Sequence, residues 1–455
     1  MMNHVYAQPN AHGSFSRSTV GLALLVAFYV GAHLRLSIYS GGSVLVPQYI
    51  CLAAGAALVA LYHRTLLKTL PLMLLLAAAL VLAPILNSPF LSTSALFETY
   101  KGGIQLLISM TLMLAVAALV TTVEPARLAR LSTRLWLLFV LLALLEFAAM
   151  RDVFEAISQA IYSASGRGLY TGVERDQLMY GQIRPKVMAT EPSFLATTLL
   201  CLCTMAILSM RSAGKPHTVR NGLLMLTVTY LVCPSMIIVF FMAAIATWMY
   251  WPRTRKGRAL ALFILGGALV LTLIAQSYMT QLAALSKLVL GEHGATGSFF
   301  GRIAVGPSVG MDVIERYPLL GVGVGNAEAA RPIIDNNWLN KGAFALFPWF
   351  ADPTLRANDL MSNGFWWQWI YMGALGGLLF IALTKALLRR IGVELPFRAI
   401  VCAWIVWYAG AAFVDPISWF ALAIFCIPPR ANFESRTDLS NLDRASIVRG
   451  AIHAR

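Results

Sequence analysis

Two basic residues and a carboxylate lie close together in the middle of the chain, just before a long apolar segment. Arg184 and Lys186 precede Glu191, and Pro192 follows it. Proline is favoured at the first position of a helix, so Glu191 is expected at the helix N-terminus, where the helix dipole favours an anion. Two interpretations stay open: Glu191 caps this helix and pairs with Arg184 or Lys186, or it has a catalytic role.

A second candidate region begins at Arg302. Apolar residues recur at helical spacing between residues 303 and 316 and predict a helix on the outer membrane surface, which would hold Arg302 near the lipid headgroups. A glycine-rich run at 319–326 follows Pro318. This run resembles a dinucleotide-binding fingerprint only superficially, because it follows a helix rather than a strand. A flexible, close-packed turn beneath a substrate is the better interpretation.

A third polar group, at residues 358–363, precedes an aromatic cluster. Its Asp359 and Asn363 could line a sugar site, since carboxylates and amides hydrogen-bond hydroxyl groups, or they could form a polar helix start. The aromatic residues that follow are typical of an interfacial belt; they are Trp366, Trp367, Trp369 and Tyr371.

Charges and thiols also occur in or beside the apolar segments. Arg35 and Glu146 lie near the ends of such segments, where a charge is paired, functional, or extended to the interface. The six cysteines do not have the spacing of a metal site, so we expect buried free thiols. They are Cys51, Cys201, Cys203, Cys233, Cys402 and Cys426.

The elements that must position these residues are apolar. Of the 455 residues, 58% are hydrophobic and only 12% are charged, whereas globular domains are about a quarter charged. The apolar residues form blocks of about twenty, enough to cross ~30 Å of hydrocarbon. We therefore predict an all-α polytopic membrane protein with about twelve transmembrane helices. The expected spans are 19–38, 43–61, 69–86, 104–123, 135–150, 193–210, 221–234, 236–251, 259–279, 361–384, 397–414 and 416–428.

The orientation follows from Lys and Arg, which gather after every second span and in the C-terminal tail. Short basic connections stay in the cytoplasm, so we predict that both termini are cytoplasmic. The net charge of +15 is then mainly a topology signal, and we expect no nucleic-acid partner.

The predicted divisions are a cytoplasmic segment 1–18, spans one to five in 19–150, a periplasmic loop 151–192, spans six to nine in 193–279, a large periplasmic loop 280–360, spans ten to twelve in 361–428 and a cytoplasmic tail 429–455. Both large loops should be partly helical, and a shorter outer connection is expected at 87–103.

In their order and spacing, these motifs resemble the O-antigen polymerase and ligase superfamily of bacterial inner-membrane proteins, the Wzy/WaaL type. The likeness covers roughly 180–390. It is carried by Arg184 to Ser193, by Arg302 with the Glu-Arg-Tyr-Pro-Leu-Leu-Gly-Val-Gly stretch at 315–323, and by Ser362-Asn363-Gly364 running into Gly373-Ala374-Leu375-Gly376-Gly377.

The resemblance implies a GT-C-type glycosyltransferase that works without a metal or other cofactor. It would take a glycan from an undecaprenyl-pyrophosphate carrier on the periplasmic face and join it to an acceptor hydroxyl. The resemblance also implies that Arg184 and Arg302 hold the pyrophosphate, because a planar guanidinium binds phosphate oxygens in pairs and stabilises the leaving group. Glu191 is the hypothesised base, with Asp359 in reserve. Further substrate contacts are expected from Lys186, Arg35, Arg316, Asn326 and Asn363.

Members of the ligase branch have a histidine just before the tenth span, where this chain has Ser362-Asn363. The one histidine in the large loop is His293, well upstream. This departure favours a polymerase that extends a lipid-linked repeat unit, with membrane lipids and a chain-length regulator as partners. A ligase that uses lipid A-core as acceptor stays open. A transporter or flippase of lipid-linked sugars is the alternative from another class, although the spans carry few charges.

Overall fold

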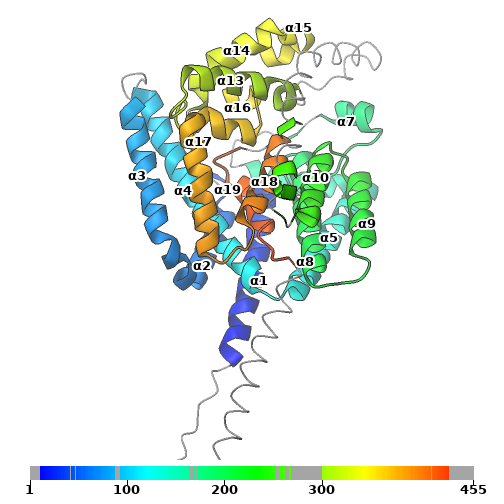
Figure 1. Ribbon diagram of the computed structural model, residues 1–455. Helices are drawn as coiled ribbons and strands as arrows, with labels where there is room; N and C mark the ends of the chain where they lie inside the picture. The colour runs from blue at the N-terminus through cyan, green and yellow to red at the C-terminus, as the bar shows by residue number, and fades with distance from the viewer. Residues whose placement is uncertain are drawn as a thin grey trace, which may run out of the picture.

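The computed structural model describes residues 11–40, 43–46, 48–87, 93–163, 169–170, 172–252, 254, 256–261, 266–267, 300–410 and 412–429. It is a bundle of long helices with a layer of shorter helices over one end (Figure 1). Within the described residues, six helical stretches are long and apolar enough to cross a membrane: Arg17–Leu34, Tyr49–Leu86, Ala95–Thr122, Pro125–Ala148, Pro192–Ser212 and Gly364–Arg390. The prediction of a helical membrane-embedded protein is confirmed.

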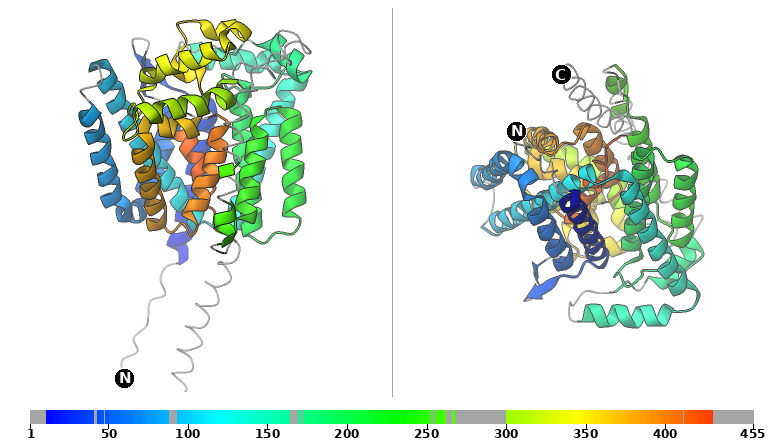
Figure 2. Two further views of the ribbon diagram at one scale, coloured as in Figure 1. Left: turned by 45° about the horizontal axis from the view of Figure 1, so that its top comes forward. Right: turned by 90° about the horizontal axis from the view of Figure 1, so that it is seen from below.

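Two helices form the centre of the bundle, and one stands at its edge. Helices α4 (Thr93–Thr122) and α8 (Pro192–Ser212) have most of their residues buried inside the protein. Helix α3 (Leu70–Asn87) exposes Leu74, Leu75 and Leu82 and lies at the edge of the bundle (Figure 2). Lipid cannot hydrogen-bond backbone polar groups, so helices are the natural spanning element for such leucine-rich segments.

The other long or apolar helices are α1 (Ala11–Leu34), α2 (Tyr49–Leu66), α5 (Pro125–Ala148), α9 (Thr218–Val232), α10 (Ile237–Tyr250), α17 (Gly364–Arg390), α18 (Pro396–Tyr408) and α19 (Pro416–Ile424). The short 3-10 turn η1 (Leu67–Thr69) joins α2 to α3.

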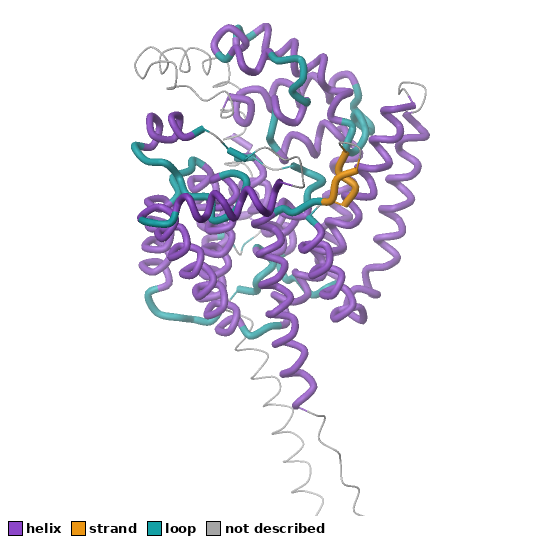
Figure 3. The backbone as a smooth tube through the Cα atoms, turned by 180° about the vertical axis from the view of Figure 1, so that it is seen from behind, coloured by secondary structure: helices purple, strands orange, loops and turns teal. Residues whose placement is uncertain are grey.

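Two expected connections differ from the structure. A two-stranded antiparallel hairpin, β1 (Ile38–Ser40) and β2 (Ser43–Val46), follows α1 (Figure 3). The first two predicted spans, 19–38 and 43–61, are therefore wrong at their facing ends, where β-branched residues and Tyr flank a Ser-Gly-Gly-Ser sequence that favours a hairpin. The predicted outer connection 87–103 is also too long, because α4 begins at Thr93.

The last two helices are short. Helix α18 has 13 residues and α19 has 9, so at 1.5 Å per residue they are about 20 Å and about 14 Å long, less than the ~30 Å of hydrocarbon. Helix α19 packs between α4 and α18 with nearly every side chain buried. The connection between α18 and α19 therefore lies below the covering layer (Figure 1). Most of the predicted span 259–279 is outside the described residues.

The layer at one end of the bundle, here called the cap, comes from the two large loops. It contains α13 (Gly306–Arg316), η5 (Ala327–Ala330), α14 (Arg331–Asn340), α15 (Ala343–Leu346), η6 (Pro348–Ala351) and α16 (Ala357–Leu360). Trp338 is fully buried there and stacks on Phe344 and Phe350. From the smaller loop, α6 (Arg151–Tyr162) runs across the long helices and α7 (Val173–Tyr180) lies at the cap end. Both loops are partly helical, as predicted.

Helix α17 is interrupted at Gly373, whose backbone (φ 66, ψ −174) is not helical. The segment after α13 fills the interruption. Pro318 O accepts a hydrogen bond from Ala374 N at 2.8 Å, and Val322 N donates to Ile370 O at 2.9 Å. The helix ends created by the interruption are thus bonded to protein, which is necessary inside a membrane.

The glycine-rich run is this inserted segment, so its glycines are explained by packing. Gly321 has φ 61, and a Cβ at that position would be 2.3 Å from Ile370 O. A Cβ on Gly373 would be 2.7 Å from Gly321 N. The turn is close-packed, as expected. The expected flexibility does not fit the structure, because hydrogen bonds to α17 hold the segment on both sides of Gly373.

Candidate functional site

Arg302 lies in a π-helical turn, η4 (Gly301–Val305), which leads into α13. Such turns are rare and frequently occur at functional sites. The half-buried guanidinium donates from Nε to Ser362 Oγ at 3.2 Å. It also packs on Gly410, where an added Cβ would be 3.2 Å from Nε. Arg302 is therefore held between the start of α17 and the α18–α19 connection.

Asn363 holds the backbone of Arg302 in place. Its Nδ2 donates to Arg302 O at 2.7 Å and to Tyr408 O at 3.1 Å, and its Oδ1 accepts from Trp366 N at 3.1 Å. The side chain is fully buried and caps α17. All three hydrogen bonds join Asn363 to backbone atoms, which gives it a positioning role, and its expected substrate contact stays a prediction.

Asn326 has a similar structural role. It is 4% exposed, and its Nδ2 donates to Val322 O at 3.2 Å within the glycine-rich run. The amide nitrogen is thus bonded within its own loop, and the substrate contact expected at Asn326 stays a prediction.

Arg35 follows α1 and packs against the start of α8. Its guanidinium carbon lies 3.6 Å from the ring centre of Phe194, in the first turn of α8. Two residues on, Ser37 Oγ accepts from Gln48 N at 3.1 Å, and Gln48 Nε2 donates to Asp415 Oδ1 at 2.8 Å. Asp415 also caps α19. The α18–α19 connection is thus contacted both by Arg302 and by the segment that follows Arg35.

Arg184 is engaged by a carboxylate that the sequence did not single out. Its Nη2 lies 2.8 Å from Asp176 Oδ1, and the side chains are 9% and 0% exposed. The guanidinium also lies over Tyr180 at 4.5 Å. Burial by itself would lower the pKa of Arg184, but the hydrogen bond to Asp176 and the neighbouring groups raise it above its ordinary value. The predicted pairing of Arg184 with Glu191 is wrong, because α7 supplies a nearer partner.

Lys186 begins a tight turn that is stabilised by contacts with the buried side chains of Glu146 and His33. Its Nζ lies 2.6 Å from Glu155 Oε2 on α6, so its predicted partner Glu191 is wrong as well. The buried Glu146 carboxylate accepts from the backbone N–H groups of Lys186 and Val187. A ring nitrogen of His33 lies 2.8 Å from Val187 O.

The turn itself has an unusual backbone. Val187 has φ 49 and the following Met188 has φ 64. Such values cost about 1–3 kcal/mol each for bulky residues and cluster at functional sites. The turn at 186–188, held by Glu146 and His33, is therefore a built feature at the entrance to α8.

Glu191 occupies the predicted place before α8, with Pro192 at the first helical position. Its carboxylate is exposed and accepts from the Ser193 hydroxyl at 2.9 Å. An exposed carboxylate near a helix N-terminus is accessible to a bound substrate.

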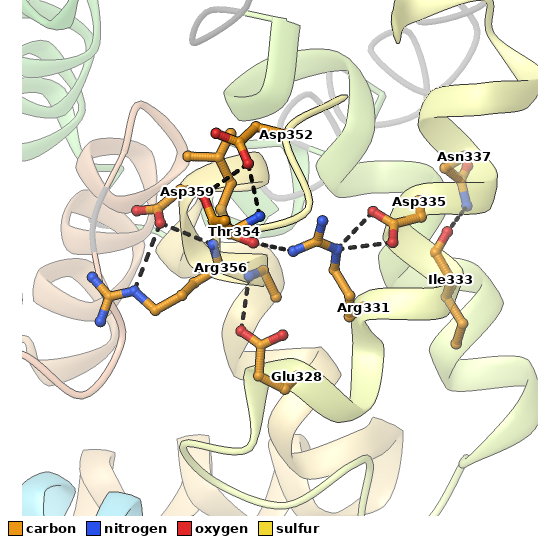
Figure 4. Close-up of polar contacts among 11 residues, drawn as sticks. Glu328, Arg331, Ile333, Asp335, Asn337, Asp352, Thr354, Arg356 and Asp359 are labelled. Carbon is orange, nitrogen blue, oxygen red and sulfur yellow. Dashed lines mark hydrogen bonds and ion pairs between the residues drawn. The ribbon is translucent and has the colours of Figure 1, made fainter. Parts of the chain in front are cut away.

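The two remaining candidates are exposed residues of the cap. Asp359 accepts a hydrogen bond from Arg356 N at 3.1 Å and lies 3.7 Å from the Arg356 guanidinium (Figure 4). These contacts form a capping box at the N-terminus of α16. Arg316 is exposed at the end of α13. Neither is brought to the α18–α19 connection by any described contact.

Sequence reasoning missed Asp176, Glu155 and Asp415. Asp176 and Glu155 are acidic residues in the smaller loop, so pairing with its basic residues could have been suspected. Asp415 precedes Pro416, a helix-start signal like the one at Glu191.

The predicted free thiols are confirmed, since all six cysteines are buried and unbridged. In the described part of the chain, no group of three or more His, Cys, Asp or Glu residues could hold a metal ion. Protein-family models, curated proteins and solved structures gave no match to this chain.

An apolar cavity of about 430 Å³ lies between α3, α4 and α17. Leu76 and Leu80 line one side, Leu379 lines another, and Leu320 and Val324 of the glycine-rich segment also border it. The cavity therefore lies among the long helices, beside the segment that is inserted at Gly373.

Proposed function

We propose that this protein is a membrane glycosyltransferase that polymerises a bacterial polysaccharide such as O-antigen. It would transfer a glycan from an undecaprenyl-pyrophosphate carrier to the terminal sugar hydroxyl of a lipid-linked repeat unit. In this proposal the chain lies in the inner membrane with about twelve spans, both termini are cytoplasmic, and the cap faces the periplasm.

The observation that carries the proposal is the position of Arg302. A π-helical turn and the amide of Asn363 hold this arginine below the cap, against Gly410 of the short α18–α19 connection. The segment that follows Arg35 contacts the same connection through Gln48 and Asp415. Arg302 and the segment that follows Arg35 thus contact one connection, and a site with arginines nearby suits the neutralisation of a pyrophosphate at the membrane surface.

The proposed roles follow from these contacts. Arg302 and Arg35 hold the pyrophosphate and stabilise the charge that grows on it as the glycosidic bond breaks. The exposed Glu191 takes the proton from the acceptor hydroxyl. Arg184 is bound to Asp176 and positions the loop that leads to Glu191. The charge balances because the proton leaves the acceptor as the pyrophosphate leaves the sugar.

The apolar cavity between α3, α4 and α17 supports a lipid-linked substrate. An isoprenoid carrier needs apolar surroundings, and burial of each CH2 group contributes about 0.8 kcal/mol. Leucines from α3 and from the glycine-rich segment supply such surroundings.

The test replaces Arg302 with Lys in a strain that lacks the chromosomal gene. Lys keeps the charge but loses the planar fork, so polymer measured as a glycan ladder should fall about 100-fold or more, as for loss of a transition-state donor. Arg356→Lys is the matched control, because the Arg356 side chain is 80% exposed and has no described contact with the α18–α19 connection. Both variants should be present in the membrane fraction in equal amounts.

Full-length polymer from Arg302→Lys, or equal loss from Arg356→Lys, would overturn the assignment of Arg302. The products that accumulate in the deletion strain distinguish a polymerase from a ligase. Single repeat units indicate a missing polymerase, whereas long polymer left on the carrier lipid indicates a missing ligase.

A transporter of lipid-linked sugars is the second candidate, because α17 is interrupted and interrupted helices form the binding sites of many transporters. Here, however, the inserted segment 317–323 is hydrogen-bonded to both sides of the interruption at Gly373. Those groups are used within the protein, so the interruption favours a structural role over a solute site.

A further inference from the structure

A second cavity lies at the end of α17 that is away from the cap. Its volume is about 540 Å³, and it is formed by one face of α17 together with Phe397 of α18. The lining changes character along the helix: Leu378, Ile381 and Ala382 come first, and a basic group formed by Lys385, Arg389 and Arg390 follows. Over these 13 positions the helix rises about 18 Å.

In the part of the chain that the structure describes, none of the three residues of the basic group forms an ion pair with a carboxylate. Arg390 donates to the backbone oxygen of Lys68 at 3.5 Å, and Lys385 lies 6.0 Å from the ring centre of Phe397. Three positive charges thus line one cavity at the end of a membrane-spanning helix.

We propose that this cavity binds one anionic phospholipid, with its phosphate on the basic group and the start of an acyl chain along Leu378 and Ile381. Basic pockets between helices at the membrane surface are suited to acidic headgroups. The apolar wall distinguishes a lipid from a free phosphate, because an inorganic ion gains nothing from contact with leucine. Leu378 is 60% exposed on the lipid-facing side of α17, so a lipid reaches the cavity directly.

This site lies apart from the cap, so the inference does not depend on the proposed glycosyltransferase activity. It also does not depend on which membrane face is cytoplasmic, since phosphate headgroups lie on both.

The test uses the full-length protein in phosphatidylcholine nanodiscs that contain a small fraction of phosphatidylglycerol, with bound lipid counted by native mass spectrometry. The cavity variant replaces Lys385, Arg389 and Arg390 with Gln. The control variant replaces Arg211, Lys215 and Arg220 with Gln; these exposed basic residues flank the connection between α8 and α9 and do not line the cavity. Each basic residue near a headgroup contributes a factor of about five, so the cavity variant should bind phosphatidylglycerol roughly 100-fold more weakly.

The control variant should keep the lipid, and millimolar inorganic phosphate should not displace it. Retention by the cavity variant, equal loss in the control variant, or displacement by phosphate would each overturn the proposal. The single variants Lys385→Gln and Arg389→Gln, expected to lose about five-fold each, replace the triple variant if it is not stably folded.

Discussion

Gly321 is the position where a single methyl group should disturb the protein most clearly. This residue has φ 61 and lies in the segment that fills the interruption of α17. A Cβ there would be 2.3 Å from Ile370 O and 2.6 Å from Gly373 N. These neighbours are backbone atoms of a packed helix and cannot rotate away.

The matched control is Gly342, which has φ 62 but no atom within 4 Å of an added Cβ. Both Ala variants carry the same conformational penalty, about 1–2 kcal/mol for a left-handed residue. Gly321→Ala adds overpacking of about 1–3 kcal/mol. The free energy of unfolding should therefore fall by about 2–5 kcal/mol for Gly321→Ala and by no more than about 2 kcal/mol for Gly342→Ala.

The six buried free cysteines provide the assay. A dye that fluoresces on reaction with thiols reports unfolding on heating in detergent, and neither substitution alters a cysteine. The midpoint should be lowest for Gly321→Ala, and that variant should also expose the cap to protease. Equal midpoints for the two variants would refute the argument that the glycine-rich run is packed tightly into α17.

Three further predictions concern the charged groups. Asp176→Asn should lower the free energy of unfolding by about 3–5 kcal/mol, because its partner Arg184 is left charged and buried. The control Glu98→Gln breaks an exposed pair with Lys101 and should lower it by less than about 1 kcal/mol. Similar midpoints for the two variants in the thiol assay would contradict this prediction. Glu146→Gln should cost about 1–3 kcal/mol, since its carboxylate accepts two backbone N–H groups and an amide satisfies them poorly; unchanged proteolysis of the loop before α8 would argue against this role. Hydrogen bonds from Thr354 lower the pKa of Asp352 below its ordinary 3.8. The stabilisation that Asp352 gives the cap is therefore present above pH 3.8 and is lost as the pH falls through the lowered pKa. Amide exchange at residues 352–355 should rise over this pH range in the parent protein and not in Asp352→Asn.

Local signals in the sequence predicted much of the frame. Apolar blocks of about twenty residues indicated membrane helices, and Pro192 indicated where α8 begins, with Glu191 just before it. The apolar spacing of 303–316 predicted a helix there, and the structure has η4 and α13 in that range. Each of these signals acts over a few residues, so the chain order is enough to interpret it.

Other features depended on which elements meet. One of the two interpretations of Glu191 paired it with Arg184 or Lys186, but α7 brings Asp176 to the arginine and α6 brings Glu155 to the lysine. The amide of Asn363, an expected substrate contact, is hydrogen-bonded to two backbone oxygens. Such assignments require knowing the distances between side chains.

The sequence by itself determined that this chain is embedded in a membrane as helices and that its polar chemistry is concentrated in a few segments between them, because lipid forces apolar composition on every spanning helix. Only the tertiary structure decided that the glycine-rich run is inserted into an interrupted helix, and that Arg302 and Gln48 contact the two ends of one short connection, at Gly410 and at Asp415. The hydrogen bond between Gln48 and Asp415 joins residues 367 positions apart. No local pattern specifies such a contact, since it forms only when the packing of the whole bundle brings the two ends together.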